Sequence, residues 1–212
     1  MRVKAIMMPF GRLACISVDN TVEEAMRIID EQGLLSLPVV NGREFVGVLS
    51  KQYMFEEYFK NFQGTKDEFV AKKVQEFMKT KIDTISENTR IEEAAAKFIT
   101  SKVRFIPITG DNNVLLGIVT QQAVFKEYQK IFGNKHNSMA IYTYDIKGVL
   151  GKICELIYKE GGDICNMMVI PTEVLDLMEV FLRVEAPDFE RVVRALERRG
   201  YDVRDVKYND QK

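Results

Sequence analysis

The chain has 212 residues, of which 46% are hydrophobic and 29% are charged, and its formal net charge is −1. This balance is typical of a soluble globular protein and argues against the strongly basic surface that binds nucleic acid. The chain holds no apolar run of the roughly 20 residues that cross a membrane, and its three cysteines form no Cys-x-x-Cys pair. We therefore expect a cytoplasmic protein with reduced thiols and with no nucleic-acid or membrane partner.

The N-terminal part of the chain is a repeat. The segment Met8–Phe62 reappears as Met78–Phe132, and Gly47, for example, returns as Gly117. A repeat of this length indicates one supersecondary unit used twice. Two such copies usually bury their sheets against each other, and their pseudo-twofold axis leaves two related clefts. This arrangement favours a ligand-sensing module.

Each copy has the hydrophobic pattern of a strand, a helix, two strands and a second helix, in the order βαββα. In the first copy we predict a strand at Cys15–Val18, a helix from Val22, strands at Leu37–Val40 and Phe45–Leu49, and a helix over about Gln52–Phe62. In the second copy we predict a helix from Ile91, strands at Phe105–Ile108 and Leu115–Val119, and a helix at Gln121–Phe132.

Two polar pairs precede the first helix of each copy. Asn20 with Glu23, and Thr89 with Glu92, have the spacing of capping boxes, so we expect their side chains to start these helices. Residues 63–73, which are polar and charged, are predicted to link the two copies.

A polar break at residues 133–138 separates a third segment with a different pattern. There we predict a strand at Ala140–Tyr144, a helix from Val149, strands at Ile164–Ile170 and Leu177–Val184, a helix around Phe189–Leu196 and a strand at Val203–Lys207. This βαββαβ order is ferredoxin-like, and the predicted fold class is α+β. The predicted domains are residues 1–66, 67–136 and 137–212.

Little in the sequence suggests catalysis. The single histidine, His136, lies in the second polar break, where a solvated side chain is the expectation. One histidine removes most Ser-His-Asp and Cys-His schemes and most histidine-based metal sites. No glycine-rich phosphate loop has the right spacing. We therefore expect no enzyme activity, no metal site and no cofactor.

Binding remains, and each copy offers one hydroxyl for it. Ser50 and Thr120 each end a strand at the start of a helix, where backbone N–H groups and a hydroxyl can hold a phosphate. The alternative is that both residues are ordinary helix N-caps, and the residues alone leave both interpretations open. Arg104 can bring positive charge to the same region, whereas the first copy has Leu35 at that position.

The third segment has a second candidate site. Gly148, Val149 and Leu150 begin a helix directly after a strand, so their N–H groups would suit a carboxylate, and Asn166 could lie nearby on the next strand. The alternative is a plain turn and helix start.

At these residues the two copies resemble CBS domains. The resemblance lies in the helix starts Val22–Ala25 and Ile91–Ala94, in the strands around Pro38 and Pro107, and in the Gly-hydrophobic-hydrophobic-Ser/Thr strand endings. A tandem pair of this kind is a Bateman module. The resemblance implies a regulatory, non-catalytic protein that binds AMP, ADP, ATP or S-adenosylmethionine in its clefts, with Thr120, Arg104, Ser50 and Tyr53 as the candidate nucleotide-binding residues.

The third segment resembles an ACT domain through Asp145-x-x-Gly148-Val149-Leu150 and through residues 162–166. This resemblance implies pairing into a homodimer, an amino acid bound near Gly148, Val149, Leu150 and Asn166, and a regulated protein partner. The order CBS–CBS–ACT is similar to that of bacterial acetoin-utilisation regulatory proteins.

The sequence departs from these families at named positions. The family's nucleotide site usually has Asp three residues after the Ser or Thr, where it holds the ribose hydroxyls; here those positions are Tyr53 and Ala123. Lys147 replaces a common Pro of the ACT loop. The alternative function is therefore a dimerising scaffold that has lost its nucleotide sites, with the ACT domain as amino-acid sensor or protein-docking module.

Overall fold

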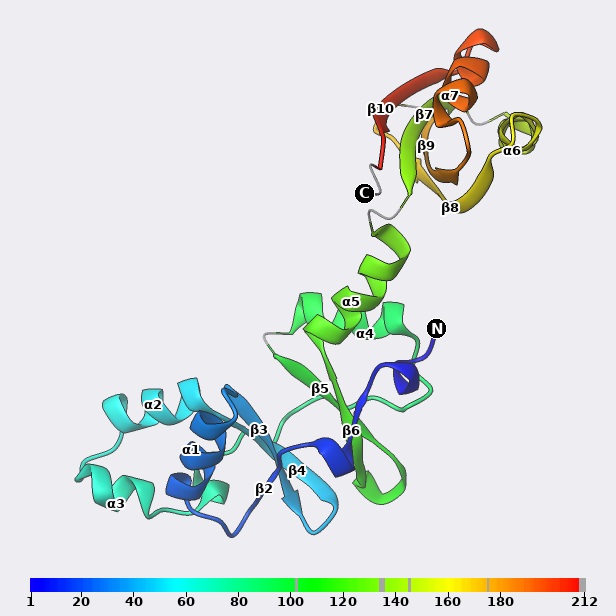
Figure 1. Cartoon of the computed structure of the whole chain (residues 1–212). Helices are drawn as coiled ribbons and strands as arrows, with labels where there is room; N and C mark the ends of the chain where they lie inside the picture. The colour runs from blue at the N-terminus through cyan, green and yellow to red at the C-terminus, as the bar shows by residue number, and fades with distance from the viewer. Residues whose placement is uncertain (102, 134–135, 145, 175, 210–212) are drawn as a thin grey trace. The chain divides into compact units, whose positions relative to one another are not determined.

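The computed structural model describes residues 1–101, 103–133, 136–144, 146–174 and 176–209 (Figure 1). Backbone contacts divide the chain into two compact units, Met1–Gln129 (unit 1) and Lys130–Lys212 (unit 2). None of the helices in the described residues is long and apolar enough to cross a membrane.

Unit 1 holds both copies of the repeat, and they build two three-stranded sheets, β2-β3-β4 and β1-β6-β5. In chain order its elements are β1 (Met8–Pro9), β2 (Ile16–Ser17), α1 (Val22–Glu31), β3 (Ser36–Asn41), β4 (Glu44–Ser50), α2 (Lys51–Lys60), α3 (Lys66–Val70), α4 (Ile91–Thr100), β5 (Phe105–Thr109), β6 (Leu115–Thr120) and α5 (Gln121–Phe132). The predicted linker at residues 63–73 therefore contains a helix, α3, whose Phe69 is buried in the core of the first copy.

The two copies exchange their leading segments. β1 pairs with β6, so that Met8 lies opposite Ile118 in the second copy. In the same way, Lys79 exchanges two backbone hydrogen bonds of 2.9 Å with Val48 in the first copy. Thus β4 of the first copy pairs with the segment at the start of the second copy, and β6 of the second copy pairs with the segment at the start of the first.

This exchange explains the repeated glycines. A Cβ on Gly47 would lie 2.6 Å from the carbonyl oxygen of Lys79, and a Cβ on Gly117 would lie even closer to the carbonyl oxygen of Met8. Real Cβ atoms do not approach backbone so closely, so only glycine lets the exchanged segment come near.

The exchange also extends across the predicted boundary between the two copies, and the domain boundaries themselves stay a prediction. Val3 is fully buried in the core of the second copy, and Val74 is fully buried in the core of the first. The two sheets share a further cluster in which Val40 and Phe45 pack against Leu115. Residues 1–66 and 67–136 are therefore not separate packing units, and the division from unit 2 falls inside α5.

Both predicted capping boxes are wrong: the one at α1 is displaced by one residue, and α4 has none. At α1 the box consists of Thr21 and Glu24, while the Asn20 side chain donates to the Glu24 carboxylate at 2.8 Å. At α4 the N-cap is Arg90, and no side chain caps the helix. The helix of the second copy therefore begins without the side-chain cap that the first copy has.

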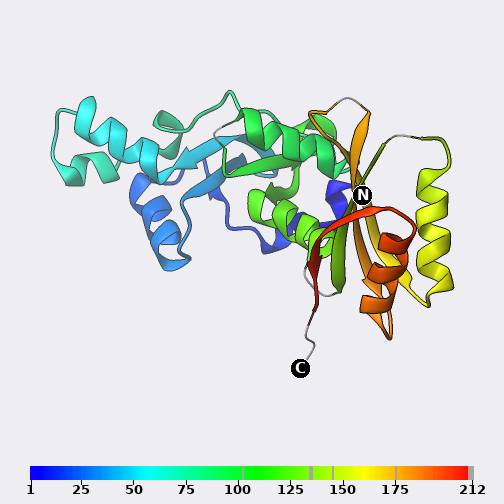
Figure 2. The ribbon, with the colours of Figure 1, turned by 90° about the horizontal axis from the view of Figure 1, so that it is seen from above.

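Unit 2 forms an antiparallel sheet of four strands in the order β10-β7-β9-β8 (Figure 2). Its elements are β7 (Asn137–Tyr144), α6 (Val149–Lys159), β8 (Asp163–Pro171), β9 (Leu177–Glu185), α7 (Phe189–Arg198) and β10 (Asp202–Lys207). Alternate residues of the two central strands, such as Ile141 and Leu182, form one core with Ile153 of α6 and Val192 of α7. The order of strands and helices is the one expected from the hydrophobic pattern.

Candidate functional site

A cleft of about 520 Å³ lies within unit 1, between the two copies. It takes residues from the end of β4, the start of α2, the segment that leads into the second copy and the start of β5. The lining residues are Ser36, Val48, Ser50, Gln52, Tyr53, Glu56, Lys79, Ile82, Ser101, Val103, Arg104, Phe105 and Gln121. We call this the Ser50 cleft. Its volume suits a small organic ligand.

Ser50 stands where β4 ends and α2 begins. It is the N-cap residue of α2 and has extended backbone angles, but its side chain makes no capping hydrogen bond. The backbone N–H groups of the first helical turn have no partners within the helix and carry the positive end of its dipole. The hydroxyl and this helix start together form a site that would favour a negatively charged group.

Tyr53 and Lys79 meet across the cleft. The Lys79 ammonium lies 4.6 Å from the centre of the Tyr53 ring, a cation–π contact. A hydrogen bond to the Glu57 carboxylate, one helical turn further on, raises the pKa of Tyr53. The phenol therefore stays protonated at neutral pH.

The charge of the cleft is positive. Its charged lining residues are Lys79 and Arg104, against the single carboxylate of Glu56. Lys79 and Arg104 are exposed, and among the described residues neither forms an ion pair. Two cations that face a cleft without a protein counter-charge suit a phosphate-bearing ligand.

The remaining wall is apolar. Val48, Ile82, Val103 and Phe105 line the same cleft. Such a surface suits a flat aromatic ring, whereas the cations and hydroxyls suit polar groups. The cleft thus offers two chemically different surfaces within reach of one ligand.

Of the predicted nucleotide residues, Ser50, Tyr53 and Arg104 line this cleft. Thr120 is not among the lining residues, although it lies opposite Phe105 and next to Gln121, which both line the cleft. Thr120 ends β6, and its hydroxyl accepts a hydrogen bond of 3.1 Å from the backbone N–H of Ala123. It therefore acts as an ordinary helix cap in this structure.

Lys79 was not among the sequence-predicted residues. It follows Met78 at the start of the second copy and reaches the cleft only because its segment pairs with β4 of the first. Lys79 lies in the cleft because of this exchanged pairing, which no local sequence pattern predicts. By the repeat, its counterpart in the first copy is Pro9, which carries no charge.

In unit 2 the predicted amino-acid residues do not come together. Gly148 starts α6 in the left-handed conformation, at φ 83°, and Val149 and Leu150 follow it. Asn166 lies on β8 opposite Arg183, which pairs with Ser138 at the start of β7. Gly148 instead follows the far end of β7, about 20 Å along the sheet at about 3.3 Å per residue.

Asn166 has one property of a binding residue. Its Oδ1 atom is buried and, in the described part of the chain, finds no hydrogen-bond donor. Asp145, which belongs to the predicted loop motif, lies outside the described residues.

Among curated proteins, the uncharacterized protein MJ1225 of Methanocaldococcus jannaschii is 27% identical over 130 residues, which is 54% of this chain and 45% of that protein. The chain spans less than half the length of the curated relatives it matches.

Several solved structures share the fold of unit 1. CBSX2 in complex with AMP has a TM-score of 0.55 and 24% identity, over 62% of this chain and 98% of that one. CbpB in complex with c-di-AMP has a TM-score of 0.55 and 21% identity, over 61% and 85%. A Vibrio cholerae protein assigned to acetoin utilization (AcuB) has a TM-score of 0.54 and 15% identity, over 62% and 93%. At these identities the similarity shows the fold alone.

A family model gives the assignment. The model for the CBS domain matches residues 3–60 and 74–130, which together make up more than half of the chain. The two matched ranges overlap the two copies of the repeat over most of their length, and α3 lies between the ranges. The chain belongs to the CBS domain family.

Proposed function

We propose that this protein is a non-catalytic regulatory protein that binds an adenine nucleotide in the Ser50 cleft. The observation that carries the proposal is the pairing of two free cations, Lys79 and Arg104, with an apolar wall in one cleft. Cations suit the phosphates of such a ligand and apolar side chains suit its base.

The residues have distinct roles in this proposal. Arg104 and Lys79 hold the phosphate, together with the Ser50 hydroxyl and the N–H groups of Gln52 and Tyr53. The N–H of Lys51, the first of α2, already donates to the Leu35 carbonyl oxygen. The Tyr53 hydroxyl donates its proton to Glu57, so its oxygen accepts a hydrogen bond from the ribose, in the position where the family usually has Asp. The base lies against Val48 and Ile82. Thr120, which is the counterpart of Ser50 in the second copy, would belong to a second, uncharged site of lower affinity.

The comparisons support the class of ligand. CBSX2 was solved with AMP and CbpB with c-di-AMP, and both share the fold of unit 1. AMP, ADP, ATP, S-adenosylmethionine and c-di-AMP are therefore the ligands to test. The assignment to acetoin utilization remains a prediction, because the similarity to AcuB is one of fold.

The test is native mass spectrometry of the full chain purified without added ligand, followed by titration with these five compounds. We expect saturable binding of at least one of them, and weaker binding of the same compound in Arg104→Ala. A wild-type chain that binds none of the five would refute the nucleotide proposal and favour the scaffold.

We also propose that the protein is a homodimer. Several large apolar side chains of unit 1 are exposed, and two of them, Phe55 and Phe125, occupy related positions on α2 and α5. Phe59 is 79% exposed, and a groove of about 490 Å³ runs beside it, lined largely by apolar atoms. A second copy would cover this surface. Analytical sedimentation should show that the wild type is a dimer and that Phe59→Glu dissociates at higher protein concentrations. A monomeric wild type would exclude the proposed homodimer.

A second candidate function rests on Asn166. We propose that unit 2 is an ACT-like module that takes an amino acid between two copies of the chain, with Asn166 from one copy and the Gly148–Leu150 helix start from the other. The buried Oδ1 without a donor supports this arrangement. Gly148→Val and Asn166→Leu should each abolish the thermal shift that a bound amino acid produces; if no amino acid shifts the wild type, unit 2 is a docking module instead.

A further inference from the structure

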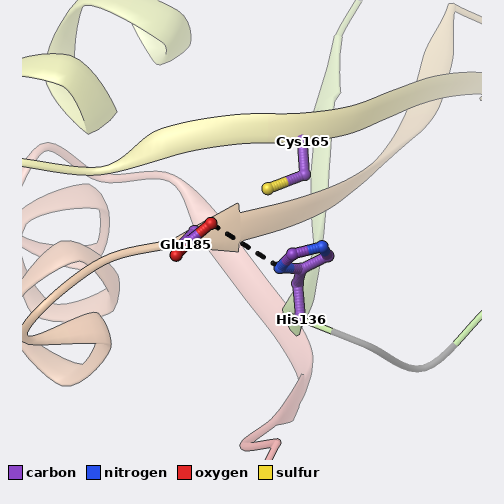
Figure 3. Close-up of side chains that lie close together, drawn as sticks. All are labelled: His136, Cys165 and Glu185. Carbon is purple, nitrogen blue, oxygen red and sulfur yellow. Dashed lines mark ion pairs between the residues drawn. The ribbon is translucent and has the colours of Figure 1, made fainter.

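We propose that His136, Cys165 and Glu185 form a binding site for Zn²⁺ at one corner of the unit 2 sheet (Figure 3). One potential ligand atom from each side chain lies within 4.8 Å of the other two. The proposal is independent of the nucleotide function, because all three residues belong to unit 2.

The strand register brings the three residues together. β9 lies between β7 and β8, and Glu185 is its last residue. Asn137 pairs with Val184, so His136 precedes β7 beside the end of β9. Asp163 pairs with Glu185, which places the start of β8 on the other side.

A bulge in β8 supplies the thiol. The register shifts between Ile164, which pairs with Val184, and Asn166, which pairs with Arg183. Cys165 is the extra residue and has no partner in β9. A bulge redirects a side chain, and here Figure 3 shows the Cys165 sulfur on the same side as the His136 ring and the Glu185 carboxylate.

The set of ligand atoms is one that zinc prefers. An imidazole nitrogen, a thiolate and a carboxylate are its usual protein ligands, with bonds of about 2.0–2.3 Å. Tetrahedral geometry at such bond lengths separates the ligand atoms by about 3.3–3.7 Å. The present spacing is slightly wider, with 4.0 Å between His136 Nδ1 and Glu185 Oε2. Small rotations of exposed side chains would close it.

The surroundings allow the metal to enter. Cys165 is exposed, the His136 side chain is 34% exposed and the Glu185 side chain is 74% exposed. Three protein ligands would leave a fourth position for water or for another ligand. Bound zinc would link His136, which precedes β7, to residues of β8 and β9, and would so stabilise unit 2.

The sequence alone does not predict this site. The expectation of no metal rested on a lone histidine and on the absence of Cys-x-x-Cys. The three ligands come from three separate strand ends, so no local spacing announces them. In the structure His136 has an acidic and a sulfur neighbour instead of solvent alone.

The test uses the untagged full chain, because a histidine tag would itself bind metal. Titration with Co²⁺ should give the near-ultraviolet charge-transfer band of a cobalt–thiolate bond at about one equivalent, and Zn²⁺ should displace it. Cys165→Ser should lose the band, whereas Cys154→Ser should retain it. His136→Ala and Glu185→Gln should weaken Zn²⁺ affinity by about 100-fold and at least about 10-fold, respectively.

Melting curves in EDTA separate a lost ligand from a lost fold. Without metal, each variant should melt like the wild type, and added Zn²⁺ should raise the melting temperatures of the wild type and Cys154→Ser more than those of the other three variants. No uptake of Co²⁺ or Zn²⁺ by the wild type, or uptake in Cys165→Ser and His136→Ala that is as tight as in the wild type, would overturn the proposal.

Discussion

The two copies of the repeat place a hydroxyl at the same point of the same backbone and use it differently. Ser50 ends β4 without capping α2, whereas Thr120 ends β6 and accepts the N–H of Ala123. The Ser50 cleft contains Tyr53, Lys79 and Arg104; the repeat substitutes Ala123, Pro9 and Leu35 at the related positions.

The two copies share the residues that pack the fold and differ in the residues that line the cleft. The exchanged strands and the two close-packed glycines occur in both copies, because both copies need them to pack. The charges occur in one copy only. Duplication thus repeats the backbone, whereas the cations that line the Ser50 cleft have no charged counterparts in the first copy.

The largest effect is expected where the copies approach most closely. Gly117→Ala would place a Cβ against the carbonyl oxygen of Met8, and Gly47→Ala would place one 2.6 Å from that of Lys79. Backbone cannot rotate away as a side chain can, so each substitution should destabilise the chain by about 1–3 kcal/mol or more. Urea unfolding would measure this. Gly11→Ala is the control, because open space surrounds that position; an equal loss there would contradict the argument.

The charges should separate the two clefts. Arg104→Ala and Lys79→Ala each remove a charged hydrogen bond of about 1.5–3 kcal/mol, so AMP affinity should fall about ten- to a hundredfold. Thr120→Ala should leave that affinity unchanged. Isothermal titration calorimetry would measure all three. Equal losses in Thr120→Ala and Arg104→Ala would mean that the clefts are equivalent.

A carboxylate should help one cleft and not the other. Tyr53→Asp restores the acceptor that the family usually presents to the ribose, and we expect AMP to bind up to about tenfold more tightly. Ala123→Asp makes the related change beside Thr120, where no cation pair would hold the phosphate, and should create no second binding event. A second equivalent of bound AMP in Ala123→Asp would show that the charges are dispensable.

The helix starts provide a smaller contrast. Thr21→Ala removes the cap of α1 and should lower the free energy of unfolding by about 0.5–2 kcal/mol. Thr89→Ala should have almost no effect, since α4 begins at Arg90 without a side-chain cap. Thermal melting compares the two variants, and equal destabilisation would contradict the assignment of the caps.

The smallest effect concerns pH. The backbone N–H of Thr21 and the side chain of Asn20 donate to Glu24 and hold its pKa below the usual value. A lowered pKa in the folded state means that the carboxylate stabilises the fold above its unfolded pKa of about 4.3, and that this contribution is lost as the pH falls through the folded pKa. Glu24→Gln should therefore melt lower than wild type at neutral pH and approach it in acid. A constant difference would disprove the linkage.

Much of the architecture follows from local patterns. Helical and strand periodicities place α1, β3, β4 and their repeats within a few residues, because each amphipathic segment has one face to bury. The same reasoning gives the strand and helix order of unit 2. It misses α3, because a helix of five residues is too short to show a helical period. It also misplaces the cap of α1 by one residue.

The sequence by itself determined the repeat, the elements within it, and the candidate residues Ser50, Tyr53 and Arg104. Tertiary structure alone decided that the leading segments exchange, and so brought Lys79 to the cleft and Val3 into the core of the other copy. It also brought His136, Cys165 and Glu185 to one corner. The physical reason is the same in both cases: pairing between strands far apart in the chain depends on register and on close backbone approach, which leave no periodic trace in the sequence.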